Sequence, residues 1–151
     1  VSAIIEEISG VPFGLEGTVE AFSKYITALR KGSENRIKKI GYHGEFIPIS
    51  EDYISAQAIS NNTLRLSTIF ELLKICGSGL DMIVFHPDTT QHELEKIIIR
   101  IGDISKRYND KPLQTRIIIP SLEDVDSNGW VDLGGLLGKA PVYKIREDDI
   151  N

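Results

Sequence analysis

The stretch Leu80–His86, LDMIVFH, is the clearest buried strand in the sequence and decides the fold. Apart from Asp81 it is apolar at both alternating sets of positions, so neither face of this strand is suited to water. A strand that is buried on both faces is typical of a parallel sheet covered by helices. We therefore predict that Leu80–His86 is the central strand of such a sheet and that its amides are well protected.

Helical and strand patterns alternate on both sides of this segment. Helices are predicted at Thr18–Arg30, at about Thr63–Cys76 and from Thr90, which opens a capping box, to about Tyr108. Strands are predicted at 11–17, 37–46 and 115–123, followed by a short helix in VDLGGLLGK and a last strand in PVYKI. The segment 50–62 is expected to be a long loop. The pattern predicts an α/β fold with a parallel sheet of about four to five strands, in one domain spanning 1–151.

Composition excludes several classes of protein. The chain carries 17 Lys and Arg against 22 Asp and Glu, a net charge of -5, which argues against a basic nucleic-acid-binding module but not against a metal enzyme. A single cysteine, Cys76, and the lack of a signal-peptide pattern favour a cytoplasmic protein. No apolar run reaches the roughly 18 residues of a membrane span. Since the sequence does not begin with Met, we expect that residues preceded Val1.

Two histidines and a glutamate fall at or near the ends of predicted strands. His43 is near the end of the second strand, His86 ends the third, and Glu123 ends the fourth. The carboxyl ends of neighbouring parallel strands meet at one edge of a sheet, where binding sites form. Two imidazoles and a carboxylate are suitable ligands for zinc, manganese or iron. The sequence therefore predicts a divalent metal site made by these three side chains.

The segments KKIGYHGEF, LDMIVFHPD and RIIIPSLED resemble the xylose isomerase-like TIM barrels, and most closely the family-2 AP endonucleases of endonuclease IV type. That family carries a histidine in a HAPY-like element, an FHPG element and a later glutamate, which match His43, His86 and Glu123. The resemblance implies a (β/α)₈ barrel and metal-assisted phosphodiester hydrolysis at abasic DNA, with clustered zinc. It also implies that Glu123 is the catalytic bridging ligand and that each histidine binds one ion.

The chain departs from this family in ways that keep two alternatives open. Asp88 stands where the family has glycine, and a complete barrel needs about 250 residues, so we expect a fragment or a shortened barrel. One alternative is a sugar isomerase or epimerase acting on a small sugar, with Glu16 and Glu45 as acid–base groups. The other is a non-catalytic half-barrel whose open sheet edge is covered by a second copy or by a partner chain.

Overall fold

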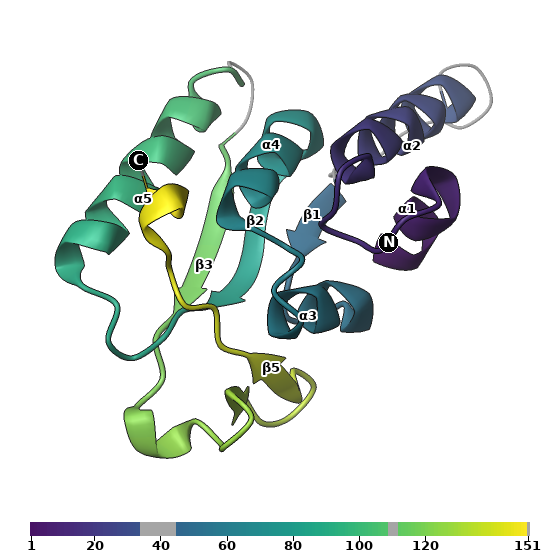
Figure 1. Cartoon of the computed structure of the whole chain (residues 1–151). Helices are drawn as coiled ribbons and strands as arrows, with labels where there is room; N and C mark the ends of the chain where they lie inside the picture. Colours follow the sequence, from purple (N-terminus) through teal and green to yellow (C-terminus); the bar gives the residue numbers. More distant parts are fainter. Residues whose placement is uncertain (34–44, 109–111, 151) are drawn as a thin grey trace.

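A three-stranded parallel sheet lies at the centre of the protein (Figure 1). The computed structural model describes residues 1–33, 45–108 and 112–150 of the chain. Strands β1 (Glu45–Pro48), β2 (Gly77–Val84) and β3 (Gln114–Ile118) are hydrogen-bonded in the order β1-β2-β3. Strand β2 is therefore central, as predicted, and the α/β class with a parallel sheet is confirmed.

Helices and a small hairpin surround this sheet. The helices are α1 (Ser2–Ser9), α2 (Thr18–Ser33), α3 (Tyr53–Ser60), α4 (Leu66–Cys76) and α5 (Gln91–Ser105), with 3₁₀ turns η1 (Leu122–Asp124) and η2 (Glu147–Asp149). Strands β4 (Trp130–Asp132) and β5 (Lys139–Pro141) form a separate antiparallel pair. Within the described ranges, no helix is both long and apolar enough to cross a membrane.

Helix α4 is the middle element of the helical layer on one face of the sheet. It packs against β1 and β2 below it and against α2 and α5 at its sides. Its buried residues are Leu66, Ile69, Phe70, Leu72, Leu73 and Cys76. A helix that is apolar on most of its surface is stable only between neighbours that cover it. The main core therefore forms between α4, its flanking helices and the sheet.

Helix α5 begins where the sequence predicts it. Thr90 is the N-cap, its hydroxyl accepts a hydrogen bond from the backbone N–H of Glu93, and the Glu93 carboxylate accepts one from the N–H of Thr90. This reciprocal pair satisfies two N–H groups that a helix end leaves free. The predicted capping box is confirmed.

The hairpin β4–β5 covers part of the opposite face of the sheet. Val131 and Ala140 of the hairpin form a second, smaller core with Val84 of β2, and Ile118 of β3 packs against it. Both sheet residues lie at the carboxyl ends of their strands. Among the described residues, the hairpin does not extend over the rest of this face, nearer the beginnings of the strands, which carries the charged side chains of Asp81 and Arg116.

Strand β2 contains an irregularity that sets which side chains face which way. The register with β3 shifts between Leu80 and Ile83, and Met82 has a φ of 57°, in the left-handed region that a methionine rarely adopts. Leu80 and Ile83 therefore both face the helical core although they are three residues apart. An extra residue of this kind is a β-bulge, which re-aims side chains relative to a regular strand. Here it places Asp81 on the face opposite the helices.

Several predicted elements are wrong in detail, each for a local reason. The strand expected at 11–17 is a turn, because Gly14 and Gly17 adopt φ values of 98° and 99°. The loop expected at 50–62 contains α3, whose buried side chains are mostly small. The short helix expected in VDLGGLLGK is the β4–β5 connection, where Gly134, Gly135 and Gly138 have positive φ.

The expected barrel is also not what the structure shows. In the described part of the chain, the parallel sheet has three strands and is open, and the fifth strand pairs antiparallel with the fourth. The strand predicted over 115–123 ends at Ile118, before Pro120, which has no N–H for a sheet ladder. The predicted second strand lies mostly outside the described residues, and its visible part is β1.

The central position of β2 predicts a large cost for truncating its core side chains. Ile83 is fully buried, so Ile83→Ala should lower the free energy of unfolding by about 2–4 kcal/mol. The matched control, Ile99→Ala on the exposed side of α5, should change it by less than about 0.5 kcal/mol. Urea unfolding measures both values. Equal effects at the two positions, or fast amide exchange in β2, would contradict the assignment of β2 to the core.

Candidate functional site

The three residues predicted to bind a metal are only partly described by the structure. His43 lies outside the described residues. His86 lies two residues beyond the end of β2, whereas Glu123 is exposed in η1, beyond the end of β3. In the described part of the chain, no three His, Cys, Asp or Glu side chains lie close enough to hold a metal ion. The site at His43, His86 and Glu123 therefore stays a prediction.

His86 makes its own local contacts in the structure. Its ring Nδ1 accepts a hydrogen bond from the backbone N–H of Asp88 at 3.2 Å and lies 3.5 Å from the Asp88 carboxylate. Of the two carboxylates considered for isomerase chemistry, Glu16 is exposed in the turn before α2, and the side chain of Glu45 lies outside the described part. The described contacts therefore do not bring Glu16 together with a second acid–base group for isomerase chemistry.

A different group of charged side chains meets on the uncovered face of the sheet. The Nε of Arg116, on β3, donates to the carboxylate of Asp81, on β2. One terminal nitrogen of the same guanidinium, Nη2, donates to Glu51 Oε1 at 3.5 Å. Glu51 follows the end of β1, so the Arg116 side chain reaches across the sheet and joins all three strands.

The guanidinium of Arg116 has a free side. Its Nη1 makes no hydrogen bond to any described residue, and the side chain is 56% exposed. The hydrogen bond to the Asp81 carboxylate raises the pKa of the Arg116 guanidinium, desolvation opposes this, and the charges of Asp81 and Glu51 add to the increase. Arg116 is therefore a permanent cation in a fixed orientation.

A pocket of about 290 Å³ lies beside this group. It is lined by Leu80, Asp81, Gln114, Thr115 and Arg116, from adjacent strands β2 and β3. Its polar side chains are those of Asp81, Gln114 and Arg116, whereas the side chain of Leu80 packs in the helical core on the other face of the sheet. In small-molecule sites, polar groups of this kind fix the orientation of the ligand.

Backbone contacts hold the two carboxylates in place. The bulge at Met82 is supported by the buried Ser50 hydroxyl, which donates to the Met82 carbonyl, so the strained turn next to Asp81 is tied to the segment after β1. The N–H groups of Glu51 and Asp52 both donate to the Pro48 carbonyl, at 3.2 and 2.9 Å. Glu51 therefore sits in a tight turn whose far end is the start of α3.

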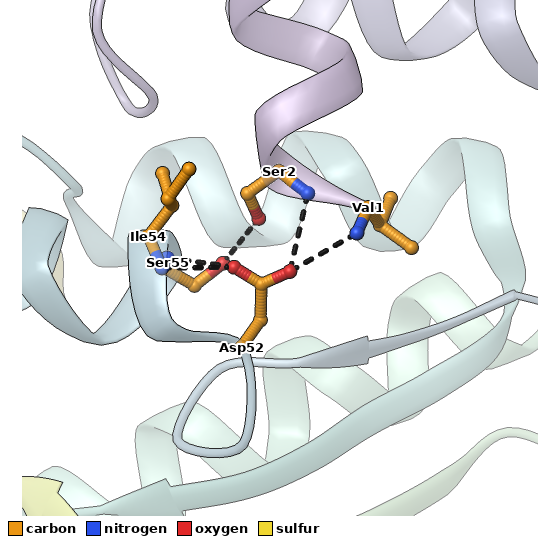
Figure 2. A network of polar contacts seen from close by, with 5 residues as sticks. All are labelled: Val1, Ser2, Asp52, Ile54 and Ser55. Carbon is orange, nitrogen blue, oxygen red and sulfur yellow. Dashed lines mark hydrogen bonds and ion pairs between the residues drawn. The ribbon is translucent and has the colours of Figure 1, made fainter.

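Asp52 anchors that turn through two helix ends (Figure 2). One carboxylate oxygen accepts from the N–H groups of Ile54 and Ser55 at the start of α3, and the other accepts from the N–H of Ser2 and from the Val1 amine. Burial alone raises the pKa of Asp52, but the hydrogen bonds from Ser55, the Val1 amine and Ser2 outweigh it, and the net pKa lies below the usual value. The carboxylate is thus a shared cap for α1 and α3.

A buried polar pair lies beside the end of β2, near His86. Tyr143 pairs with the strand through its backbone, accepting from the N–H of His86 at 3.0 Å. Its hydroxyl donates to Asp149 at 2.8 Å and accepts from the N–H of Leu66, the first residue of α4, at 2.9 Å. Burial raises the pKa of the Asp149 carboxyl, and burial together with Asp149 raises that of Tyr143. Both groups have hydrogen-bond partners within the described fold. We therefore interpret the pair as structural, because it holds the segment 143–149 against α4 and the end of β2.

The sequence contains a signal for the Arg116 group that lies outside the histidine and glutamate pattern. Asp81 is the one acidic residue inside the apolar run Leu80–His86, and Arg116 interrupts the next predicted strand in the same way. A charged side chain inside a two-faced apolar strand must be paired or must face an opening. That the two residues meet across the sheet follows only from the register of β2 and β3.

Comparison with known proteins relates the chain to one family of proteins. A family model described as "Uncharacterised ACR (DUF711)" matches residues 1–124. UPF0210 proteins of Pyrobaculum aerophilum and Clostridium botulinum are each 35% identical, over 147 and 150 residues, covering 96% and 98% of this chain and 32% of each relative. A UPF0210 protein of Streptococcus suis is 34% identical over 148 residues, covering 97% of this chain and 32% of the relative. The chain spans about a third of the length of the curated relatives it matches. No solved structure matches the chain.

These matches overturn the resemblance to the xylose isomerase-like barrels and the endonuclease IV family. The endonuclease activity and the role in DNA repair inferred from that resemblance are wrong with it. The misleading motif was short: Val84–Pro87 is a buried strand end followed by His and Pro, and four residues of this kind do not identify a family. The expected metal, partners and cytoplasmic location stay predictions.

The shared cap predicts how stability depends on Asp52. Asp52→Ala should lower the free energy of unfolding by about 1–2 kcal/mol at pH 7. Because the folded pKa lies below the ordinary value of 3.8, this contribution is present above pH 3.8 and is lost as pH falls through the folded pKa. Urea unfolding at pH 7 and near pH 3 measures the difference, with the exposed Asp103→Ala as control. A cost that is the same at both pH values would contradict the cap.

The buried pair predicts the opposite pH dependence for Asp149. Its folded pKa is raised, so the stability it contributes is greatest below 3.8 and is lost as pH rises through the folded pKa. The unfolding free energy of the wild type minus that of Asp149→Asn should therefore fall with rising pH. Tyr143→Phe should cost about 1–3 kcal/mol at neutral pH, because it removes a partner from both Asp149 and the Leu66 N–H. A pH-independent difference for Asp149→Asn would contradict the raised pKa.

Proposed function

Since this chain belongs to the DUF711, or UPF0210, family, we propose a function from its geometry: it binds a small carboxylate- or phosphate-bearing molecule through Arg116. The ligand would lie in the pocket between β2 and β3 on the uncovered face of the sheet. The proposal concerns only the binding of a ligand by this chain, which spans about a third of the length of its relatives. It assigns no reaction.

The observation that carries the proposal is the oriented guanidinium of Arg116. Its Nε and Nη2 are held by carboxylates, while Nη1 has no described partner and the pocket is adjacent. Guanidinium groups form strong, directional hydrogen bonds with carboxylates and phosphates, often with two N–H groups at once. A group that is already oriented loses little side-chain entropy when a ligand binds.

The two existing carboxylates differ in how firmly they hold Arg116. Asp81 is the closer partner and its side chain is only 18% exposed, whereas the Glu51 contact is at 3.5 Å and its side chain is 38% exposed. An anionic ligand can therefore replace Glu51 at Nη2 and use Nη1 as well, while Asp81 keeps the guanidinium in place. Glu51 then acts as a competitor for the anion rather than as part of its binding site.

Binding measurements with simple probes test this proposal. Inorganic phosphate and succinate should each be detected by calorimetry, and Arg116→Met should weaken binding at least tenfold, since a charge-assisted hydrogen bond contributes about 1.5–3 kcal/mol. Glu51→Gln should strengthen binding, because it removes the competing negative charge. The matched control is Arg107→Met, an exposed arginine just after α5, which should leave binding unchanged.

The sign of the Glu51→Gln effect separates this proposal from a cation site. If the two carboxylates were the ligand-binding groups, Glu51→Gln would weaken binding, and a diamine such as 1,4-diaminobutane would bind in place of the anions. That result, or the absence of binding by both anionic probes, would overturn the proposal.

A further inference from the structure

Helix α5 leaves two large apolar side chains uncovered. Ile98 and Ile99 are 57% and 63% exposed, although α5 buries Ile97, Ile101 and Ile104 in the main core. The helix therefore has apolar residues on a second side, turned away from that core. Two adjacent exposed isoleucines on one helix surface are typical of a contact with another element.

Gly102 lies on the same side of α5 as these isoleucines. It follows Ile98 by four residues and Ile99 by three, the spacing of neighbours on a helix surface. No atom lies within 4 Å of the position a Cβ would take there, so nothing in the described structure requires glycine. A glycine inside a helix costs roughly 0.5–1 kcal/mol relative to alanine. It is explained if a second helix approaches closely at this point.

The sheet is also open beside this helix. Strand β3 is the last strand in the order β1-β2-β3, so one side of its backbone pairs with no strand in the described ranges. Figure 1 shows β3 and α5 at the same end of the molecule, away from α2 and α1. Ile119, which directly follows β3, is 43% exposed. An unpaired edge and an uncovered apolar helix surface thus occur together.

We infer that a further strand–helix unit docks here, its strand pairing parallel with β3 and its helix packing on Ile98, Ile99 and Gly102. Consecutive strand–helix units in a parallel sheet add side by side with the same handedness, which puts each new helix next to the previous one. The docking unit would come from the polypeptide that makes up the other two thirds of the relatives' length. A second copy of this chain fits less well, because two-fold symmetry pairs β3 with itself in the antiparallel sense.

Co-expression tests this docking. The chain would be produced with a tagged version of the part of the Pyrobaculum aerophilum relative that lies outside the matched 147 residues. The expected result is a one-to-one complex in which Ile99→Cys reacts with maleimide at least tenfold more slowly than in the chain alone. Lys24→Cys is the control, since Lys24 is 65% exposed on α2 at the other end of the sheet, and its labelling should not change.

Two further variants make the outcome decisive. Ile98→Glu should weaken the complex at least tenfold while the circular dichroism of the chain alone stays unchanged, because Ile98 contacts solvent in the isolated chain. Gly102→Leu should also weaken it, through steric clash with the docking helix. A folded chain that forms no complex, a complex with unprotected Ile99→Cys, or a homodimer that protects this position would each overturn the inference.

Discussion

The bulge in β2 is the constraint on which the rest of the structure depends. A strand in the middle of a parallel sheet must serve the helical core on one face, and in the described part of the chain the hairpin covers the opposite face only near the carboxyl ends of the strands. One extra residue between Leu80 and Ile83 lets both side chains enter the helical core and places Asp81 on the other face. The left-handed backbone of Met82 is the strain that accompanies this arrangement, and the hydrogen bond from Ser50 holds it.

The position of Asp81 then determines which charged side chains meet on the face opposite the helices. A carboxylate there needs a partner, and Arg116 on the neighbouring strand supplies it. Because the arginine side chain is long, it also reaches Glu51 beyond β1, so one cation links the segments of all three strands on this face. The same contacts that neutralise Asp81 leave one nitrogen of the guanidinium beside a pocket. The arrangement that pairs Asp81 with Arg116 is therefore the same one that we propose binds an anionic ligand.

The carboxyl ends of the strands are organised differently from what the motifs suggested. There the hairpin covers Val84, and Tyr143 continues the pairing of β2 past the end of β1. The buried Asp149 is held by the Tyr143 hydroxyl and the Arg146 N–H, close to the start of α4. A strand end that in many α/β proteins is open to a ligand is, in this part of the chain, filled by side chains of the last residues.

The sequence by itself determined the class of the fold and most of its helical layer. Apolar periodicity located α2, α4 and α5, the capping box marked the start of α5, and the two-faced run at Leu80–His86 identified the central strand. These features are local, because they depend on residues within a few turns of each other. The sequence did not predict α3, since its buried residues are mostly small and its signal is the single cap Asp52.

Only the tertiary structure decided the candidate site. Glu51, Asp81 and Arg116 lie far apart in the sequence, and no motif joins them. Their meeting depends on the register of three strands and on a bulge that changes which face Asp81 occupies. A shift of one residue in a strand moves a side chain to the other face, so no reading of single strands could place this group. The glycines of the hairpin illustrate the same limit, because positive φ at Gly134 and Gly135 turned an expected helix into the connection between two strands.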